Sequence, residues 1–491
     1  MLTDRLPEGL YCAEQVRAMD RYAIEHMKVP GIVLMQRAGR AAFCVLRHHW
    51  PEAKSIAVLC GGGNNGGDGY ILARYALDEG LAVTVFALSP PDRLQGDALL
   101  AWESYRAAKG EVTETLPITL EGFDVVVDAL LGTGLDREVA GKYAQAISHI
   151  NAFSGGVLAI DIPSGLHADT GAILGHAVEA DASVTFIGLK RGLFTGEGPA
   201  CAGKIWYADL EVAEAIPAGG KPAAWLLSYR NLLPPRRRTA HKGHFGHVLV
   251  VGGEVGFTGA ARMAAEAALR VGAGLVSVAT RKSHAAYLNL GRPEIMAHGV
   301  ETPEELERLL QRATVAAIGP GLGQSEWAKS LLRSVLASSL PLVVDADALN
   351  LLAQVPAKRE NWILTPHPGE AARLLGSTSA AVQKDRFAAL AGLIERYGGV
   401  SVLKGAGTLI GTGGQIPWVC ALGNPGMASG GMGDVLTGVL AGLMAQGLKP
   451  LEAARMGVSL HAAAADAAAA KGERGMLASD LLPWLYRLLN R

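Results

Sequence analysis

A glycine-dense segment near the C-terminus carries a single carboxylate where an apolar helix is expected to begin. The segment is GNPGMASGGMGDV, residues 423–435, and the carboxylate is Asp434. Bare backbone N–H groups and the helix dipole favour phosphate oxygens at such a helix start. A carboxylate beside a bound phosphate would be repelled unless it removes a proton from an attacking hydroxyl or holds a metal ion. The alternative is that Asp434 only caps the helix, because Asp is a preferred capping residue.

A second glycine-rich motif, CGGGNNGGDG at residues 60–69, combines two amides with a carboxylate. It follows the apolar run 55–59 and precedes a helical pattern, so the expected order is strand, glycine loop, helix. The glycines allow close backbone approach to a phosphate, as in a dinucleotide-binding fingerprint, but that fingerprint does not require Asn64, Asn65 and Asp68. We interpret these three side chains as ligands of a ribose, a phosphate or a cation.

Polar residues also follow later strands expected in the first half. Asp128 lies within the run VVVDALL, and the GTG turn at 132–134 follows that run. Asp161 and Ser164 follow GVLAI. In open parallel sheets, ligands bind beyond the carboxyl ends of the strands, so these groups should share one cleft with the glycine motif. Cation binding, ribose binding and acid–base chemistry stay open as alternatives for that cleft. Asp128 has the further alternative of capping the loop after its strand.

The second half places chemically capable residues after strands in the same way. They are the GPGLG turn at 319–323, Asp345 and Asp347 in DADALN, the TPHPGE loop at 365–370 and the KGAGT loop at 404–408. His367 lies between two prolines and is either a site residue or the histidine of an ordinary turn. Lys404 ends an apolar strand, where an unpaired ammonium is costly to bury. A phosphate is therefore an expected partner, with a snorkelling side chain as the alternative.

Two α/β domains are expected to position these residues. On each side of residue 230, short apolar or β-branched runs alternate with helical patterns, which is typical of a parallel sheet covered on both faces. Examples are SIAVLC, LAVTVFAL and GVLAIDIPSG before the division, and GHVLVVGG, LPLVVDADAL and VSVLKGAGTLI after it. We predict two doubly wound domains, residues 1–225 and 226–491, each with its own glycine-rich loop.

Composition argues against several classes of function. Of the 491 residues, 49% are hydrophobic and 19% are charged, and the net charge is −1, so neither a nucleic acid nor a membrane is an expected partner. No apolar stretch reaches the ~18 residues of a membrane span, and the N-terminus lacks the apolar core of a signal peptide. The five cysteines are scattered without a CxxC pair, which predicts a reducing, cytoplasmic location. We interpret the RRR cluster at 236–238 as a solvated linker.

Longer motifs resemble those of a known family. The first half, with CGGGNNGGDG, DALLGTGLDREVAG and AIDIPSGLHADTG, resembles the Rossmann-like YjeF N-terminal domain, the epimerase of hydrated nicotinamide cofactors. The second half, with HKGHFGHVLVVGG, LTPHPGE, KGAGT and NPGMASGGMGD, resembles the ribokinase-like dehydratase of the same repair pathway. The resemblance runs from about residue 10 to residue 490, so nearly the whole chain is similar to the bifunctional NAD(P)H-hydrate repair enzymes.

The resemblance implies a damaged cofactor as the substrate. In the hydrates of NADH and NADPH, called NADHX and NADPHX, water has added across the C5=C6 bond and left a hydroxyl at C6 in the R or S configuration. The epimerase half would interconvert the two forms. The dehydratase half would restore the double bond of the S form at the expense of ADP, giving AMP and phosphate. The resemblance further implies Mg²⁺ with the nucleotide, K⁺ in the epimerase half and a homo-oligomer.

Roles for individual residues also follow from the resemblance. Asp434 matches the catalytic base of the dehydratase, and Asp161 matches the acid–base residue near the nicotinamide ring in the epimerase. The positions that match potassium ligands are Asn65, Asp128 and Ser164. The positions that match the substrate-binding loops of the epimerase are Asn64, Asn65, Gly66, Gly67, Asp68, Gly132, Thr133, Gly134, Leu135, Asp136, Arg137 and Glu138. Those that match the nucleotide site are Lys404, Gly405, Ala406, Gly407, Thr408 and Gly433, and those that match contacts to the hydrated cofactor are Ala260, Gly323 and His367.

The main alternative is a ribokinase-like vitamin kinase whose first half only binds a ligand. Such kinases share the GxGD chemistry, and YjeF N-type domains also occur as binding modules. Those kinases lack the fused first half, however, and the presence of Asp161 with the full NNGGDG loop argues against a purely binding role. A stable phosphorylated alcohol made with ATP would identify a kinase.

Overall fold

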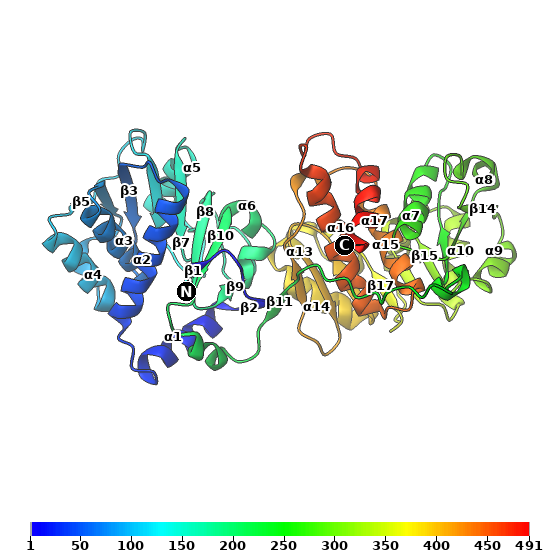
Figure 1. The fold of residues 1–491 in the computed structure, drawn as a ribbon, viewed down its shortest axis with the longest axis horizontal. Helices are drawn as coiled ribbons and strands as arrows, with labels where there is room; N and C mark the ends of the chain where they lie inside the picture. Colours follow the sequence, from blue (N-terminus) through cyan, green and yellow to red (C-terminus); the bar gives the residue numbers. More distant parts are fainter. Residues whose placement is uncertain (1, 491) are drawn as a thin grey trace. The chain divides into compact units, whose positions relative to one another are not determined.

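The computed structural model describes residues 2–490, and the chain divides into two compact units. The first unit runs up to Leu226 and the second begins at Leu227 (Figure 1). Each unit is built around its own main sheet, with helices packed against it and a hydrophobic core of its own.

The main sheet of the first unit has the strand order β1-β10-β8-β7-β6-β3-β4-β5. The strands are β1 (Leu2–Thr3), β3 (Ser55–Cys60), β4 (Ala82–Ala87), β5 (Glu111–Thr113), β6 (Val125–Ala129), β7 (Gly156–Ile160), β8 (Ala182–Phe186) and β10 (Lys204–Ala208). Neighbouring strands pair in parallel except β1, which is antiparallel to β10. The strand order reverses at β3, which has β4 on one side and β6 on the other, and such a switch point opens a crevice at the carboxyl ends of the strands.

Helices cover both faces of this sheet. The helices α2 (Gly31–His49), α3 (Asn64–Asp78) and α4 (Gly96–Ala107) share one core with it, and α5 (Gly141–Asn151) shares another. Alternate residues of β3 serve the two cores, because successive side chains of a strand point to opposite faces. Ile56 and Val58 belong to the first core, and Ala57 and Leu59 belong to the second. The continuous apolar run of β3 therefore results from burial on both sides.

Three short strands complete the first unit. They are β2 (Gly9–Tyr11), β9 (Leu189–Lys190) and β11 (Ala224–Leu226), and β2 pairs with β9 in parallel and with β11 in antiparallel orientation. Helix α1 (Ala13–Glu25) follows β2 and packs against the 3₁₀ helix Ala213–Gly219. Because β9 ends at Lys190, the pairing of β2 with β9 fixes the position of that lysine's backbone.

The main sheet of the second unit has the order β14-β13-β12-β15-β16-β17-β18-β19-β20. The strands are β12 (His247–Val251), β13 (Leu275–Thr280), β14 (Met296–Gly299), β15 (Val315–Ile318), β16 (Leu342–Val344), β17 (Trp362–Leu364), β18 (Val400–Leu403), β19 (Thr408–Thr412) and β20 (Trp418–Cys420). The strands from β14 to β18 pair in parallel, and β19 and β20 add an antiparallel edge. Helix α16 (Pro450–Ala469) contributes many small residues to the core beside this sheet.

Helices α7 (Thr258–Arg270) and α15 (Met432–Ala445) approach each other closely, and small residues make this approach possible. A Cβ added to Gly438 would lie 2.0 Å from the carbonyl oxygen of Ala264. Glycine inside a helix costs about 1 kcal/mol relative to alanine, but here it allows backbone contact. This contact fixes the start of α15, which carries Asp434.

The prediction of two α/β folds with largely parallel sheets is confirmed, with two differences in detail. Helix α3 begins at Asn64, so the NNGGD residues form its first turns instead of a preceding loop. The run VSVLKGAGTLI forms two antiparallel strands, because Gly405 and Gly407, with φ of +134° and +61°, turn the chain back after β18. Glycine adopts such positive φ values without the steric cost of a side chain.

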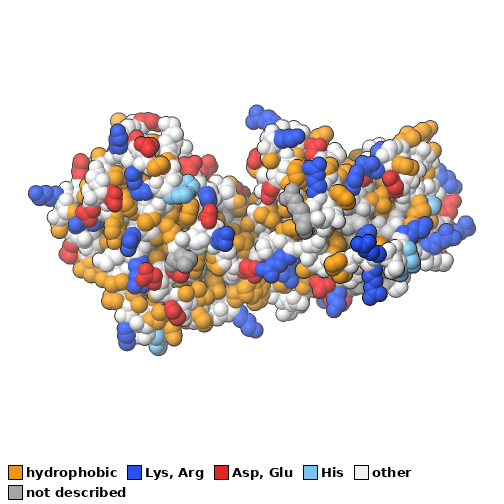
Figure 2. Space-filling model, in the orientation of Figure 1, with side chains coloured by type: hydrophobic (Ala, Val, Ile, Leu, Met, Phe, Trp, Pro, Cys, Tyr) orange, Lys and Arg blue, Asp and Glu red, His pale blue; other side chains and the backbone are white. Residues whose placement is uncertain are grey.

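The surface carries both signs of charge. Figure 2 shows Lys and Arg side chains interspersed with Asp and Glu on the visible face of each unit, in agreement with the net charge of −1. Within residues 2–490, no helix combines the length and the apolar character that crossing a membrane requires. The expected absence of a nucleic-acid partner stays a prediction.

We predict that Gly438→Ala destabilises the second unit, although alanine is the better helix former. The added Cβ meets a backbone oxygen that cannot rotate away, so α7 and α15 must separate. Overpacking of this kind costs about 1–3 kcal/mol. Denaturant unfolding followed by circular dichroism should therefore show a lower midpoint for this variant.

Gly259→Ala on α7 is the matched control, because its added Cβ has no atom within 4 Å apart from its chain neighbours and the backbone of its own helix. Its midpoint should stay the same or rise slightly. A midpoint for Gly438→Ala as high as that of the unaltered chain would contradict the packing argument.

Candidate active sites

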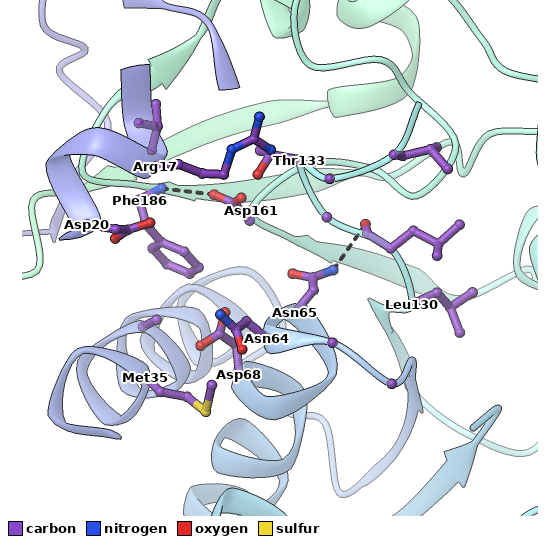
Figure 3. Close-up of a pocket in the computed structure, with 18 of the residues that line it drawn as sticks. Arg17, Asp20, Met35, Asn64, Asn65, Asp68, Leu130, Thr133, Asp161 and Phe186 are labelled. Carbon is purple, nitrogen blue, oxygen red and sulfur yellow. Dashed lines mark hydrogen bonds between the residues drawn. The ribbon is translucent and has the colours of Figure 1, made fainter. Parts of the chain in front are cut away.

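The first unit contains a pocket of about 910 Å³ that most of the predicted epimerase residues line; Asp128 and Ser164 are not among its lining residues (Figure 3). Asn64, Asn65 and Asp68 line it from α3, and Asp161 lies across the pocket from them. The whole predicted loop 132–138 lines the pocket as well. The switch point of the sheet thus gathers groups that are separated by nearly a hundred residues in sequence.

Gly66 and Gly67 of the same motif do not line this pocket. Both are buried within the first turns of α3. A Cβ added to Gly66 would lie 2.1 Å from the Gly61 carbonyl oxygen, and one added to Gly67 would lie 2.6 Å from the end of the Met35 side chain. The absence of side chains at these glycines therefore allows α3 to begin directly after the glycine turn. This early start places the polar side chains of the first turns of α3 at the pocket.

The three expected potassium ligands meet around the backbone of Leu131. Its carbonyl oxygen lies 3.2 Å from Asn65 Nδ2 and 3.1 Å from Ser164 Oγ, and its N–H donates to Ser164 Oγ at 2.8 Å. Asp128 is fully buried and accepts from Ser164 N–H at 2.7 Å, Ser164 Oγ at 2.6 Å and Leu130 N–H at 3.1 Å. Burial raises the pKa of Asp128 to about 6, although these hydrogen bonds act in the opposite direction.

This arrangement offers oxygen atoms to a hard cation. Asn65 Oδ1 is buried without a hydrogen-bond partner within residues 2–490. Together with the Asp128 carboxyl and Ser164 Oγ it forms the oxygen-rich set that such cations prefer. Because Asp128 also accepts the Leu130 N–H, the alternative of a loop cap holds as well and is compatible with ion binding.

Asp161 follows β7 with a φ of +65°, a left-handed conformation that is strained for a residue other than glycine. Its backbone N–H donates to the carbonyl oxygen of Val184 at 2.7 Å. Its Oδ1 accepts from Phe186 N–H at 3.3 Å, from Thr185 Oγ1 at 3.4 Å and from the ammonium of Lys190. The segment around the end of β8 therefore determines where this carboxylate points.

Two more carboxyl groups line the pocket near Asp161. Burial raises the pKa of Asp68 well above its ordinary value, and the charges of Asp161 and Asp20 raise it further. Burial raises the pKa of Asp20 to about 6, while the charge of Lys190 acts in the opposite direction. The pocket therefore combines a carboxylate paired with lysine and carboxyl groups whose pKa values burial raises, a combination suited to acid–base chemistry.

Sequence reasoning missed Lys190, Asp20 and Arg17, all of which line this pocket. The signal applied to Lys404, a lysine at the end of an apolar strand, also fits Lys190 in SVTFIGLK. Asp20 and Arg17 lie on α1, which has neither a glycine motif nor a strand end beside them. Only the folded structure brings that helix to the pocket (Figure 3).

In the second unit, Asp345 joins segments that are far apart in sequence. Its Oδ1 accepts from Lys404 Nζ at 2.7 Å, and its Oδ2 accepts from Thr437 Oγ1 at 2.8 Å. Burial alone would raise the pKa of Asp345, but the charge and hydrogen bond of Lys404 outweigh burial and lower it. Burial alone would lower the pKa of Lys404, but Asp345 and Glu370 outweigh burial and raise it. Lys404 is therefore a firmly charged, ion-paired side chain.

Asp434 lies in the first turn of α15, where the capping residue is Gly431 and no side chain caps the helix. The capping alternative for Asp434 is therefore wrong. Burial raises the pKa of Asp434 to about 7, with Asp345 raising it and Lys404 lowering it. A Cβ added to Gly433 would lie 3.3 Å from Lys404 Nζ and 3.4 Å from Asp345 Oδ2, so this glycine leaves room beside the lysine. A carboxyl group with such a pKa is suited to accept a proton near pH 7.

The residues after Lys404 form the tight turn between β18 and β19. Gly405 and Gly407 have positive φ, and Thr408 Oγ1 donates to the Gly405 carbonyl oxygen at 2.9 Å. Ala406 lies between the two glycines at the tip of the turn. The turn therefore presents backbone groups next to the paired lysine, as a phosphate site requires.

The GPGLG turn is tied to the acidic segment after β16. Gly323 N–H donates to Asp347 Oδ2 at 2.9 Å, and the charge of Asp347 also raises the pKa of Asp434. Ala260 on α7 lies beside this turn, because a Cβ added to Gly321 would be 3.2 Å from the Ala260 Cβ. The structure therefore brings Ala260 and Gly323 to the same turn and links that turn to Asp434.

His367 is the N-cap residue of α12 (Pro368–Leu375), and its Nδ1 accepts from the Gly369 N–H at 2.9 Å. The alternative prediction, that His367 is the histidine of an ordinary turn, therefore describes part of its role. The ring is half exposed, and its Nε2 lies 3.5 Å from Glu370 Oε1. Burial and the charge of Lys404 lower its pKa, which favours the neutral ring at pH 7.

Two family models match this chain. Residues 31–192 match the family described as YjeF-related protein N-terminus, and residues 248–487 match the family described as NAD(P)H-hydrate dehydratase. The two matches lie on opposite sides of the division between the compact units.

Several named proteins are similar over almost the full length. A bifunctional NAD(P)H-hydrate repair enzyme Nnr from Coxiella burnetii is 51% identical and covers 98% of this chain and 99% of its own. The protein of the same name from Escherichia coli is 45% identical, and the match covers 99% of this chain and 95% of that protein. A solved structure of an ADP/ATP-dependent NAD(P)H-hydrate dehydratase from Bacillus subtilis is 30% identical, covers 54% of this chain and 98% of its own, and has a TM-score of 0.48. On the strength of these full-length similarities, the chain belongs to the family of bifunctional NAD(P)H-hydrate repair enzymes.

Proposed function

We propose that this chain repairs hydrated nicotinamide cofactors with two activities. The first unit interconverts the R and S hydrates of NADH and NADPH, and the second dehydrates the S hydrate at the expense of ADP. The observation that carries the proposal is Asp434, a half-buried carboxyl group with a pKa raised to about 7 beside the paired Lys404 at the glycine-rich start of α15. The full-length similarity to named repair enzymes and the acidic pocket of the first unit support both activities.

In the dehydratase reaction, Asp434 accepts the proton of the C6 hydroxyl, and the hydroxyl oxygen attacks the terminal phosphorus of ADP. The bond from that phosphorus to the bridging oxygen breaks, and AMP leaves. The C6 phosphate ester then loses phosphate while C5 loses a proton, which restores the C5=C6 bond. The S hydrate and ADP thus give the reduced cofactor, AMP and phosphate.

The phosphates of ADP are expected at the start of α15 and at the turn 405–408. The N–H groups of Gly431 and Gly433 and the dipole of α15 favour an anion there, and Lys404 supplies a cation. Mg²⁺ would supply further positive charge next to the phosphates. The described residues contain no group of three or more His, Cys, Asp or Glu side chains gathered for a metal ion. An ion held mainly by nucleotide phosphates and water fits that arrangement.

In the epimerase reaction, Asp161 is the acid–base group at the wall of the pocket. Inversion at C6 requires proton transfer at a substituent of that carbon, and Asp68 is a second carboxyl group in the pocket, with a pKa raised well above its ordinary value. K⁺ would be held by Asn65, Asp128 and Ser164, where the unsatisfied Asn65 Oδ1 supports ion binding, and would supply fixed positive charge next to the substrate.

The proposal includes a cytoplasmic location and a homo-oligomer. Within residues 2–490, none of the cysteines forms a disulfide bond, which suits a reducing compartment; they are Cys12, Cys44, Cys60, Cys201 and Cys420. The homo-oligomeric state follows from the family resemblance alone.

The first prediction of this function is that the purified chain restores the absorbance of reduced nicotinamide. A mixture of R and S NADH hydrate with Mg²⁺ and ADP should recover completely, because the epimerase feeds the dehydratase. Recovery limited to the S fraction would refute the epimerase activity. No recovery with ADP or ATP, combined with phosphorylation of a stable alcohol, would establish the vitamin kinase instead.

The second prediction concerns Asp434→Asn, which keeps the shape of the side chain but removes its basicity. Dehydration of the S hydrate should fall by about 10²–10⁴-fold, the usual contribution of a general base. Interconversion of R and S hydrates by the same protein should not change, and this serves as the internal control. Dehydration within about threefold of the unaltered chain would exclude Asp434 as the base.

The third prediction concerns pH. Because Asp434 must be ionised to accept a proton and its pKa is raised to about 7, kcat/KM for dehydration should rise about tenfold per pH unit below pH 7 and level off above it. The measurement is the initial rate of absorbance recovery from the S hydrate between pH 5.5 and pH 8.5. A rate that is already constant at pH 5.5 would contradict the assignment.

A further inference from the structure

Lys190 is buried in the first unit, and all of its hydrogen-bonding capacity is used inside the protein. Its side chain is 1% exposed. Its ammonium donates to Asp161 Oδ1, to Thr185 Oγ1 at 3.1 Å and to the Phe186 carbonyl oxygen at 3.1 Å. A lysine ammonium has three donors, so none is left for a substrate.

The contacts of Lys190 make the two oxygens of Asp161 unequal. Oδ1 accepts from Lys190, from Phe186 N–H and from Thr185 Oγ1, and Thr185 in turn accepts from Lys190. Oδ2 accepts no hydrogen bond from the part of the chain that the structure describes. The Asp161 side chain is 16% exposed and lines the pocket, so Oδ2 is the oxygen that is available to a ligand.

The turn that leads to Lys190 is itself held in a strained shape. Ile187 has a φ of +61°, which is rare for a β-branched residue. Its carbonyl oxygen accepts from the Tyr207 hydroxyl at 2.7 Å, and Gly188 N–H donates to the Phe186 carbonyl oxygen at 2.6 Å. Strain of this kind persists where the surroundings over-determine a geometry, and it clusters at functional sites.

We propose that Lys190 is a positioning residue of the epimerase, which holds the Asp161 carboxylate through Oδ1 so that Oδ2 exchanges a proton with the C6 hydroxyl while one bond to C6 breaks and re-forms on the opposite face. This inference rests on the epimerase function proposed above. Arg17, Asp20 and Asp68 also line the pocket, but the structure gives none of them a hydrogen bond to Asp161. Lys190 is therefore the charged group that orients this carboxylate.

The test measures conversion of pure R NADH hydrate to the S form by chromatography, without nucleotide, using full-length protein. Lys190→Met keeps the length of the side chain and removes the charge and the donors. It should lower the epimerase kcat by at least about 100-fold, as expected for a misplaced acid–base group. The KM for the hydrate should stay within about threefold, because Lys190 has no free donor for the substrate. Dehydration of the S hydrate with Mg²⁺ and ADP should be unchanged.

Thr185→Val provides a milder variant in case Lys190→Met does not fold. It removes the one hydroxyl that links Lys190 to Asp161 and should lower kcat by about 3–10-fold, the usual effect of one hydrogen bond. Lys204→Met, at a half-exposed lysine on β10, is the matched control and should behave like the unaltered chain.

Two results would overturn the inference. One is a Lys190→Met protein with a kcat within twofold of the unaltered chain. The other is that Lys190→Met and Thr185→Val each lower kcat and raise KM by the same factor and also lower the melting temperature. This result would show a purely structural role. If the unaltered chain itself does not interconvert the hydrates, the proposed epimerase function fails instead, and this outcome is distinct from the other two.

Discussion

Each unit is organised around a buried ion pair between a lysine and an aspartate at the ends of parallel strands. In the first unit the pair is Lys190 with Asp161, and in the second it is Lys404 with Asp345. A parallel sheet covered on both faces leaves little room for polar groups along its strands, so charge is confined to the strand ends. A buried ammonium without a partner would be strongly unfavourable, and the aspartates make these lysines possible.

The pairing also divides the carboxyl groups of each site into two kinds. Asp345 accepts hydrogen bonds from Lys404 and Thr437 and so holds their two segments together; we call this arrangement the Asp345 clamp. Asp434 is not part of the clamp, and the pKa of Asp434 rises because of its burial and the charges of neighbouring aspartates. In the first unit the lysine-paired carboxylate, Asp161, is instead the proposed acid–base group, and Asp68, which has no lysine hydrogen bond, has a pKa raised by burial. Groups of one residue type thus acquire opposite tasks from their surroundings, as acid–base catalysis requires.

Much of the fold could be predicted from the sequence, because apolar runs and glycine turns mark the strands and the starts of helices. The strand-end rule likewise pointed to Asp161 and Lys404, since carboxyl ends of parallel strands share one edge, and the glycine-rich helix start pointed to Asp434. The rule does not reach residues whose place depends on tertiary packing. Asp20 lies on α1, an amphipathic helix whose sequence gives no sign of the pocket it faces. The sequence also did not show which group pairs with a charged residue. A phosphate was the predicted partner of Lys404, and in the structure its ammonium donates to Asp345.

The Asp345 clamp has a consequence for the order in which the two activities arise. Lys404 lies 59 residues after Asp345, and Thr437 lies 92 residues after it, so the clamp closes only when long loops have closed. A chain emerges from the ribosome with its N-terminal part first. A nascent or truncated chain that ends before Thr437 therefore carries every residue of the first pocket but an open clamp in the second unit. Such a chain would keep the first pocket complete and the second site unfinished, so the Asp345 contacts form only after every residue of the first pocket has been made.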